Sequence, residues 1–131
     1  MIPEKLKTIF FISIPVFIAH GLEEYFTGFY KIDLSYRYLF GCISDLPVVF
    51  LIYQILLWLL LIIVYCLLGK SWIKWILILV GITYVGELQH LIMTIILKQY
   101  YPGAITSIAI SIIGCIFLKE LLKNFRQNYE N

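Results

Sequence analysis

One uncharged stretch constrains the fold of this chain more than any other feature. Residues 46–68 are 23 residues without an acid or a basic side chain, and Gln54 is their single amide. A helix rises about 1.5 Å per residue, so this stretch can cross a hydrocarbon core about 30 Å thick. The chain is also 62% hydrophobic and only 14% charged, which excludes a soluble domain of this size. The sequence therefore predicts a membrane protein.

Three further apolar stretches have softer edges. Together with residues 46–68 they give four predicted spans, at about residues 8–30, 46–68, 72–97 and 104–122. We predict an all-α, polytopic membrane protein in which residues 1–131 form one four-transmembrane-helix bundle. Cys42, Cys66 and Cys115 are widely separated and form no C-x-x-C pair, so we interpret them as apolar packing residues.

The distribution of basic residues predicts the orientation. Seven of the ten lie in the N-terminal segment, in or beside the connection between the second and third spans, and in the C-terminal tail: Lys5, Lys7, Lys70, Lys74, Lys119, Lys123 and Arg126. Both termini should therefore be cytoplasmic. A net charge of +2, spread over membrane edges, excludes a nucleic-acid partner and leaves membrane lipids as the expected surroundings. Usage of Ile and Lys favours a multi-pass protein of a bacterial plasma membrane.

Two predicted spans carry acids and imidazoles at apolar depth. The first contains His20-Gly-Leu-Glu23-Glu24, and the third contains Glu87-Leu-Gln-His90. A charged group there costs several kcal/mol unless it is paired, protonated or bound to a cation. The first and third spans run in the same direction across the membrane. His20 lies about 18 Å from the start of its span at Thr8, and Glu87 about 22 Å from the start of its span at Trp72, so the two groups can meet in the outer half of the bilayer.

These residue types suit a divalent metal. Neutral imidazole and ionised carboxylate are good ligands for zinc, iron or manganese, and the cation would offset the cost of burying the acids. We predict His20, Glu24, Glu87 and His90 as metal ligands and Glu23 and Glu24 as catalytic acids, with Glu23 a candidate general base. The set falls one carboxylate short of a two-iron bundle, which favours one ion.

Four other polar residues are candidate supporting or substrate-contacting groups: Gln54, Thr27, Tyr101 and Thr106. The simpler interpretation of the whole cluster is that buried His and Glu only hydrogen-bond between helices and fix their packing. Gly103, Ser107 and Ser111 recur every four residues and form a small face that lets a neighbouring helix approach.

The residues resemble a known family of small integral membrane proteins named for the HXXEE motif. The resemblance rests on His20-Gly-Leu-Glu23-Glu24, on Glu87-x-x-His90 and on Tyr101-Pro102-Gly103 followed by Thr106. It implies four membrane helices and a site, without supplying a reaction.

Three classes of function fit this pattern. The first is a metal-dependent membrane enzyme, hydrolytic in kind, acting on a lipid or lipid-like small molecule. The second is a metal-free, glutamate-dependent intramembrane protease or lipid isomerase. The protease would need an arginine near its acids, and Arg37 is the nearest. The third is a carrier or binding protein for a cation or small amine.

Overall fold

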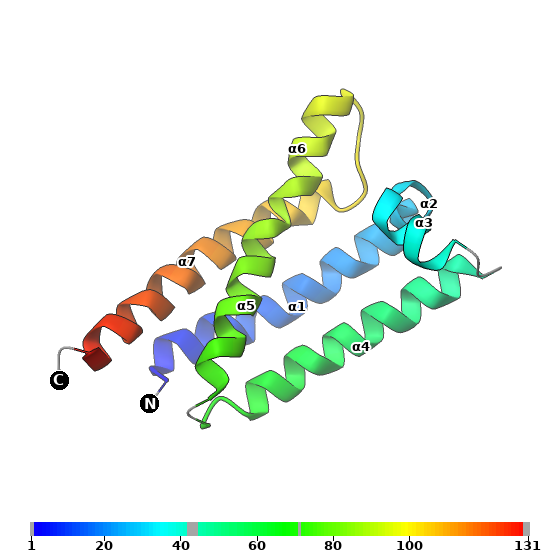
Figure 1. The fold of residues 1–131 in the computed structure, drawn as a ribbon. Coiled ribbons are helices and arrows are strands. Elements are labelled where there is room, and N and C mark those ends of the chain that lie inside the picture. Colours follow the sequence, from blue (N-terminus) through cyan, green and yellow to red (C-terminus); the bar gives the residue numbers. More distant parts are fainter. Residues whose placement is uncertain (1, 42–44, 71, 130–131) are drawn as a thin grey trace.

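Long helices dominate the computed structural model, which describes residues 2–41, 45–70 and 72–129 (Figure 1). The long segments are α1 (Glu4–Thr27), α4 (Leu46–Cys66), α5 (Ile73–Gly86) continued by α6 (Leu88–Leu97), and α7 (Ala104–Tyr129). Two short helices, α2 (Phe29–Ile32) and α3 (Leu34–Phe40), connect α1 to α4. The described residues contain no strand, and four helical segments are long and apolar enough to cross a membrane. The predicted all-helical fold, with four helical segments that could span a membrane, is confirmed.

Local chemistry sets the helix ends around the first connection. Helix α1 ends at Thr27 because Gly28 adopts a left-handed conformation, with φ 80°, and its N–H bonds back to the carbonyls of Glu24 and Tyr25. Asp33 then begins α3 by accepting a hydrogen bond from the Tyr36 N–H at 2.7 Å. The expected first span, residues 8–30, therefore corresponds to a helix that begins and ends earlier.

The third span is interrupted at Glu87. Helix α5 ends at Gly86 and α6 begins at Leu88, and Figure 1 shows α6 turning away from the line of α5. The His90 N–H bonds to the Glu87 carbonyl at 3.2 Å, three residues back rather than four. Irregular backbone at membrane depth occurs where it is buried in protein or lines a cavity. The break is therefore a position at which a functional site is expected.

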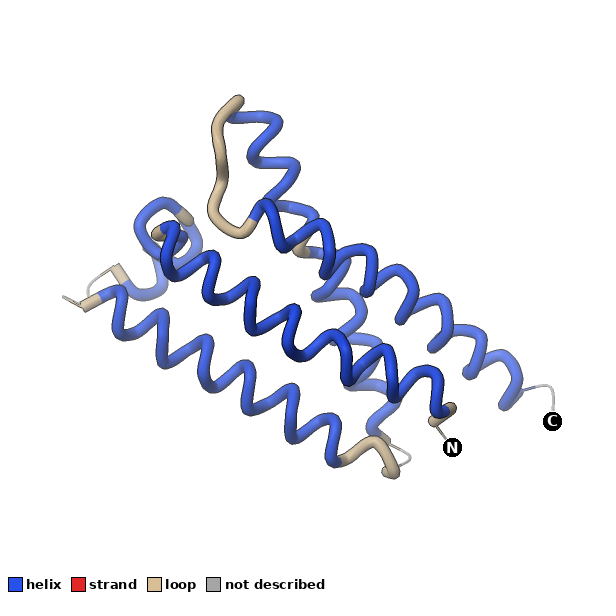
Figure 2. The backbone as a smooth tube through the Cα atoms, turned by 180° about the vertical axis from the view of Figure 1, so that it is seen from behind, coloured by secondary structure: helices blue, strands red, loops and turns tan. Residues whose placement is uncertain are grey.

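Helix α1 is the centre of the arrangement. It lies between α4 and α7, as Figure 2 shows from behind, and α7 also packs along α5 and α6. The main apolar core fills the half of the bundle that holds both termini, around Phe10, Leu77 and Phe117. A smaller aromatic cluster around Tyr30, Tyr36 and Phe50 fills the other end. The polar residues of interest lie between these two clusters.

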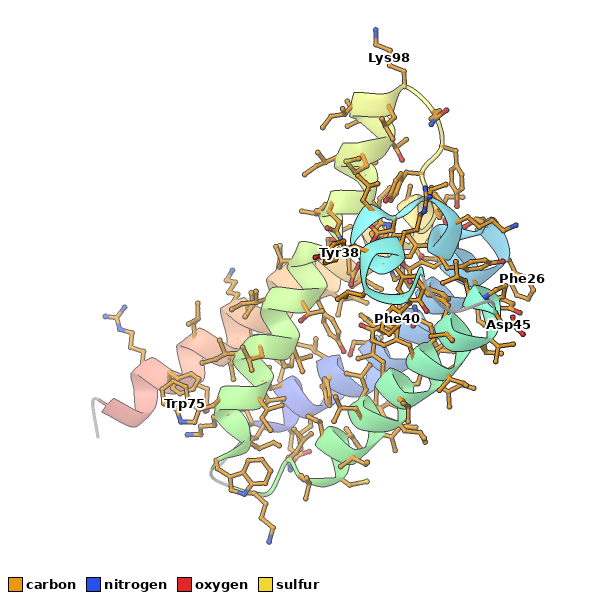
Figure 3. All side chains as sticks on the ribbon, turned by 45° about the vertical axis from the view of Figure 1, so that its right-hand side comes forward. Phe26, Tyr38, Phe40, Asp45, Trp75 and Lys98 are labelled. Carbon is orange, nitrogen blue, oxygen red and sulfur yellow. The ribbon has the colours of Figure 1, made fainter. Side chains whose placement is uncertain are left out.

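Large apolar side chains cover the outside of the bundle. Phe26, Tyr38 and Trp75 are 79%, 90% and 69% exposed, and Figure 3 shows Phe26 at one edge of the bundle. So broad an apolar surface suits contact with lipid. Cys66 and Cys115 are free thiols on this exposed surface, while Cys42 lies outside the described residues.

Candidate metal centre

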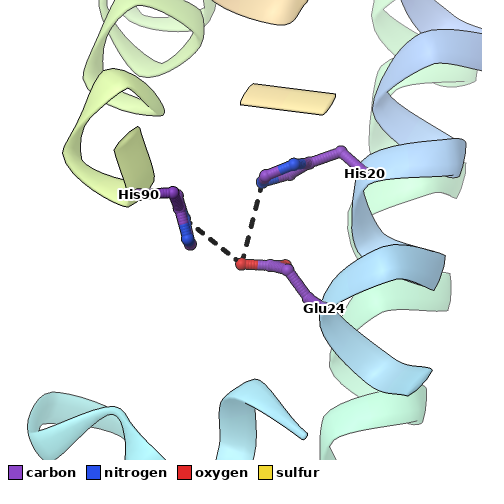
Figure 4. A group of neighbouring side chains, drawn as sticks. All are labelled: His20, Glu24 and His90. Carbon is purple, nitrogen blue, oxygen red and sulfur yellow. Dashed lines mark ion pairs between the residues drawn. The ribbon is translucent and has the colours of Figure 1, made fainter. Parts of the chain in front are cut away.

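Two imidazoles and two carboxylates meet between the helices. Helix α1 contributes His20 and Glu24, whereas Glu87 and His90 come from the break and the first turn of α6. The His20 Nε2 lies 3.2 Å from a Glu87 oxygen and 3.7 Å from a Glu24 oxygen. The His90 Nε2 lies 3.1 Å and 3.4 Å from the same two oxygens. Figure 4 shows both rings directed at the Glu24 carboxylate.

The backbone decides which nitrogen of His90 carries its proton. The His90 Nδ1 lies 2.5 Å from the carbonyl oxygen of Pro102, which can only accept a hydrogen bond. The Nδ1 is therefore the donor, and a neutral His90 presents a lone pair at Nε2. That lone pair faces Glu24 and Glu87.

A relay through Thr106 gives His20 the same tautomer. The Thr106 hydroxyl donates its hydrogen to the Glu23 carboxylate in a short hydrogen bond. The same oxygen, 2.8 Å from the His20 Nδ1, is then an acceptor, so Nδ1 carries the imidazole proton. A neutral His20 thus also presents a lone pair at Nε2. Such hydrogen bonds to the remote nitrogen orient histidines that bind metals.

Lone pairs of imidazole and carboxylate repel one another unless a positive charge lies between them. Two ligands held about 2.0–2.1 Å from one ion lie about 2.8–3.4 Å apart, for angles between a right angle and the tetrahedral angle. Three of the four nitrogen–oxygen separations, at 3.1, 3.2 and 3.4 Å, fall within that range, whereas the His20–Glu24 separation of 3.7 Å is wider. His20, Glu24 and His90 are buried, with ligand atoms within 4.8 Å of one another, so this group could hold a metal ion.

Glu23 binds different partners from those of the adjacent Glu24. Its two oxygens accept hydrogen bonds from the Ile105 N–H at 3.1 Å, the Thr106 N–H at 2.9 Å, the Tyr100 hydroxyl at 2.5 Å and the Thr106 hydroxyl. These donors include backbone groups that begin α7, where a negative charge is favourable. The structure therefore places Glu23 on the start of α7 and Glu24 with the imidazoles.

The remaining candidates are divided between the centre and its surroundings. The Gln54 amide donates to Glu24 at 2.8 Å and orients that carboxylate from α4. The Tyr101 ring packs 5.7 Å from the His90 ring, and its hydroxyl lies 3.4 Å from Asp33. Burial and that carboxylate raise the pKa of Tyr101 to about 12, so its hydroxyl stays protonated. Thr27 is exposed and bonds to the Glu23 carbonyl on its own helix.

Gly103 forms part of the centre, although its spacing with Ser107 and Ser111 indicated only packing. Its φ is 87°, and a Cβ there would meet His20 at 2.8 Å, His90 at 2.9 Å and Glu24 at 3.1 Å. Only glycine lets the chain pass so close to all three side chains. The Tyr-Pro-Gly turn was the available signal, but its distance from the acids depends on the tertiary fold.

A cavity of about 340 Å³ reaches the centre from one side. Glu24, Glu87 and His90 line it, together with aromatic side chains from α2, α3 and α4. This volume lies within the range of small-molecule sites. The group of imidazoles and carboxylates is thus accessible to a molecule that enters between the helices.

One comparison with known proteins gives a match. The model of a family described as "Protein of unknown function with HXXEE motif" matches residues 11–118. Neither the comparison with curated proteins nor that with solved structures finds a match.

Proposed function

The chain belongs to the HXXEE-motif family, as the resemblance of its sequence predicted, and from its buried centre we propose that it is a metal-dependent membrane hydrolase. The observation that carries the proposal is the meeting of two imidazole Nε2 atoms with two carboxylates at one end of a cavity. Helix packing alone does not require both Nε2 atoms to face acids. A lipid-like substrate is proposed because the cavity lies among membrane-spanning helices.

We assign the ion to His20, Glu24 and His90. Two histidines and one glutamate are a familiar ligand set for catalytic zinc, and such a set leaves a position free for water. When bound, zinc, iron or manganese supplies Lewis acidity toward a carbonyl or phosphoryl group and acidifies a water molecule. The His20–Thr106–Glu23 relay and the His90–Pro102 hydrogen bond hold the two rings in the ligating tautomer.

Glu87 is the proposed general base. Its side chain is 14% exposed and lines the cavity, with one oxygen 3.1–3.2 Å from both Nε2 atoms. It can therefore accept a proton from water at the open side of the centre and return it to the leaving group. Glu23 is less suited to this role because four donors already occupy its carboxylate. We propose that Glu23 acts instead as a positioning residue, through Thr106.

Isotope-labelled water tests the reaction class without a known substrate. Purified protein would be incubated with vesicles of total bacterial lipid extract in ¹⁸O-labelled water, and the products analysed by mass spectrometry. We expect a product that carries ¹⁸O, forms only with the metal-loaded protein and is lost in Glu87→Gln. Glu120→Gln, which replaces the half-buried partner of Lys5, is the matched control and should keep the activity.

The other outcomes separate the competing functions. Product formation that survives removal of the metal but not Glu24→Gln would support the metal-free glutamate enzyme instead. Uptake of a cation or amine into vesicles, dependent on Glu87 and without chemical change, would support the carrier. Either result would overturn the proposed hydrolase.

A further inference from the structure

The cavity beside the metal centre combines aromatic rings with acids. Phe29, Tyr36, Phe40, Phe50 and Tyr53 supply rings to its wall. Its charged lining residues are Glu24, Asp33 and Glu87, and no Lys or Arg is found among the described residues that line it. Such a wall repels anions and attracts cations, because ammonium groups bind favourably to both carboxylates and ring faces.

A second cavity extends this surface toward the connections. It has a volume of about 520 Å³ and shares Asp33 and Gln89 with the first. Its described lining also lacks Lys and Arg, and its polar members include Gln99 and Tyr101. Asp33 therefore lines both cavities, each of which offers room for part of a bound molecule.

Asp33 supplies the charge that a bound metal would leave uncompensated. A divalent ion would balance Glu24 and Glu87, whereas Asp33 belongs to the connection between α2 and α3. One Asp33 oxygen accepts the Tyr36 N–H at 2.7 Å, and among the described residues the other has only the long contact of 3.4 Å with the Tyr101 hydroxyl. The second oxygen therefore keeps capacity to accept a stronger, charge-assisted hydrogen bond.

Tyr36 gives an independent indication of a ligand. The residue is 7% exposed and lines the first cavity, yet its hydroxyl has no hydrogen-bond partner among the described residues. A buried hydroxyl without a partner is costly, and a polar group of a bound molecule would satisfy it. The neighbouring rings of Phe40 and Phe50, 4.8 and 5.3 Å from that of Tyr36, surround the rest of such a molecule with apolar surface.

We propose that these cavities bind an amphiphile whose head carries a protonated amine, with the ammonium beside Asp33 and its apolar chain among the aromatic rings. Lipids with an anionic head are excluded by the same charges. The identification of this amphiphile as the substrate rests on the proposed hydrolase. The binding of the amphiphile at this site does not depend on the proposed hydrolase.

Matched amphiphiles test the proposal directly. Dodecylamine, dodecanol and dodecyl phosphate share one chain and differ in the charge of the head. Their dissociation constants would be measured by native mass spectrometry of the metal-loaded protein. We expect dodecylamine to bind at least about tenfold more tightly than dodecyl phosphate, with dodecanol between them.

Asp33→Asn is the informative variant, since asparagine also begins helices well and keeps the start of α3. We expect it to lose about tenfold in affinity for dodecylamine and little for dodecanol. Asp45→Asn removes the same charge just before α4, away from both cavity linings, and should bind all three as the natural protein does. Figure 3 shows Asp45 at the end of α4.

Equal or tighter binding of dodecyl phosphate would overturn the proposal, as would an Asp33→Asn variant that keeps its preference for the amine. Failure of the two proposals can be told apart. Amine binding that depends on Asp33, in a protein that incorporates no ¹⁸O, would support the amine site and refute the hydrolase. Labelled products from anionic lipids, without amine binding, would do the reverse.

Discussion

At the scale of single residues, the groups behind the histidines decide what the centre can bind. The Pro102 carbonyl and the Thr106 hydroxyl occupy the two Nδ1 atoms and leave both Nε2 atoms to face Glu24 and Glu87. Without those partners, either ring can take the other tautomer and place N–H where a ligand is needed. The residues that hold the rings should therefore matter nearly as much as the ligands.

Thr106→Val tests the relay. The change keeps the shape of the side chain but removes the acceptor for His20 and one donor to Glu23, so we expect metal affinity to fall about 10- to 100-fold. The measurement is competition with a chromogenic chelator. Thr83→Val is the control, because its hydroxyl bonds to the Leu79 carbonyl on its own helix. Equal affinities of the two variants would contradict the relay.

Gly103→Ala tests the close passage over the centre. Its positive φ costs about 1–2 kcal/mol in a residue with a Cβ, and the new methyl group would lie 2.8 Å from His20. We expect the metal-free protein to lose at least that much free energy of unfolding, measured in detergent. Gly69→Ala, where a Cβ meets no described atom within 4 Å, should change it by less than about 1 kcal/mol. A Gly103→Ala variant as stable as Gly69→Ala would refute this account of the turn.

Residue types and helical spacing were enough to find most of the centre from the sequence. His20 and Glu24 are one turn apart, and Glu87 and His90 share another face, so periodicity predicts both pairs. Periodicity could not separate Glu23 from Glu24, because adjacent residues differ by about 100° around the helix and either can face the bundle. That distinction depends on where α7 begins, which is a tertiary property. The position of Gly103 beside the centre was not predicted either, because it too depends on the tertiary fold.

At the scale of the elements, the approach of α4 to α1 sets the position of Glu24. A Cβ at Gly21 would lie 2.5 Å from the Gln54 Oε1 and 3.1 Å from Trp58, so glycine allows the two helices to approach closely. The same Gln54 donates to Glu24. Gln54 therefore takes part both in the packing of α4 against α1 and in the orientation of the Glu24 carboxylate.

A double-mutant cycle measures that contact. We expect Gly21→Ala to destabilise the protein by at least about 1 kcal/mol more in the natural background than in a Gln54→Ala background, where the clash is relieved. The readout is the free energy of unfolding in detergent. Gly86→Ala, where a Cβ meets no described atom within 4 Å, is the control and should not depend on Gln54. Additive effects of Gly21→Ala and Gln54→Ala would contradict the contact.

The break between α5 and α6 was not predicted from the sequence. Residues 72–97 form one apolar stretch without proline, so hydropathy predicts a single uninterrupted span. The structure interrupts it at Glu87, which is also a member of the centre. A local departure from regular helix at a functional position has no signature in periodicity, because the side-chain pattern on either side is almost unchanged.

At the scale of the whole molecule, Figure 1 shows the two termini at the same end of the bundle, opposite the tip of α6. The distribution of Lys and Arg predicts that this end is cytoplasmic. A reporter enzyme that is active only outside the cytoplasm should be inactive when fused to the C-terminus and active when inserted after Lys98. The opposite pattern would invert the orientation and place the cavity openings on the cytoplasmic side.

The central claim is that His20, Glu24 and His90 hold a metal ion, and elemental analysis of the detergent-purified protein tests it most directly. We predict near-stoichiometric zinc, iron or manganese in the natural protein and in Glu120→Gln, and its loss in His20→Ala/His90→Ala and in Glu24→Gln. Circular dichroism would show that each variant keeps its helices. Natural protein without metal, even after reloading, or variants that keep the metal in full would contradict the claim.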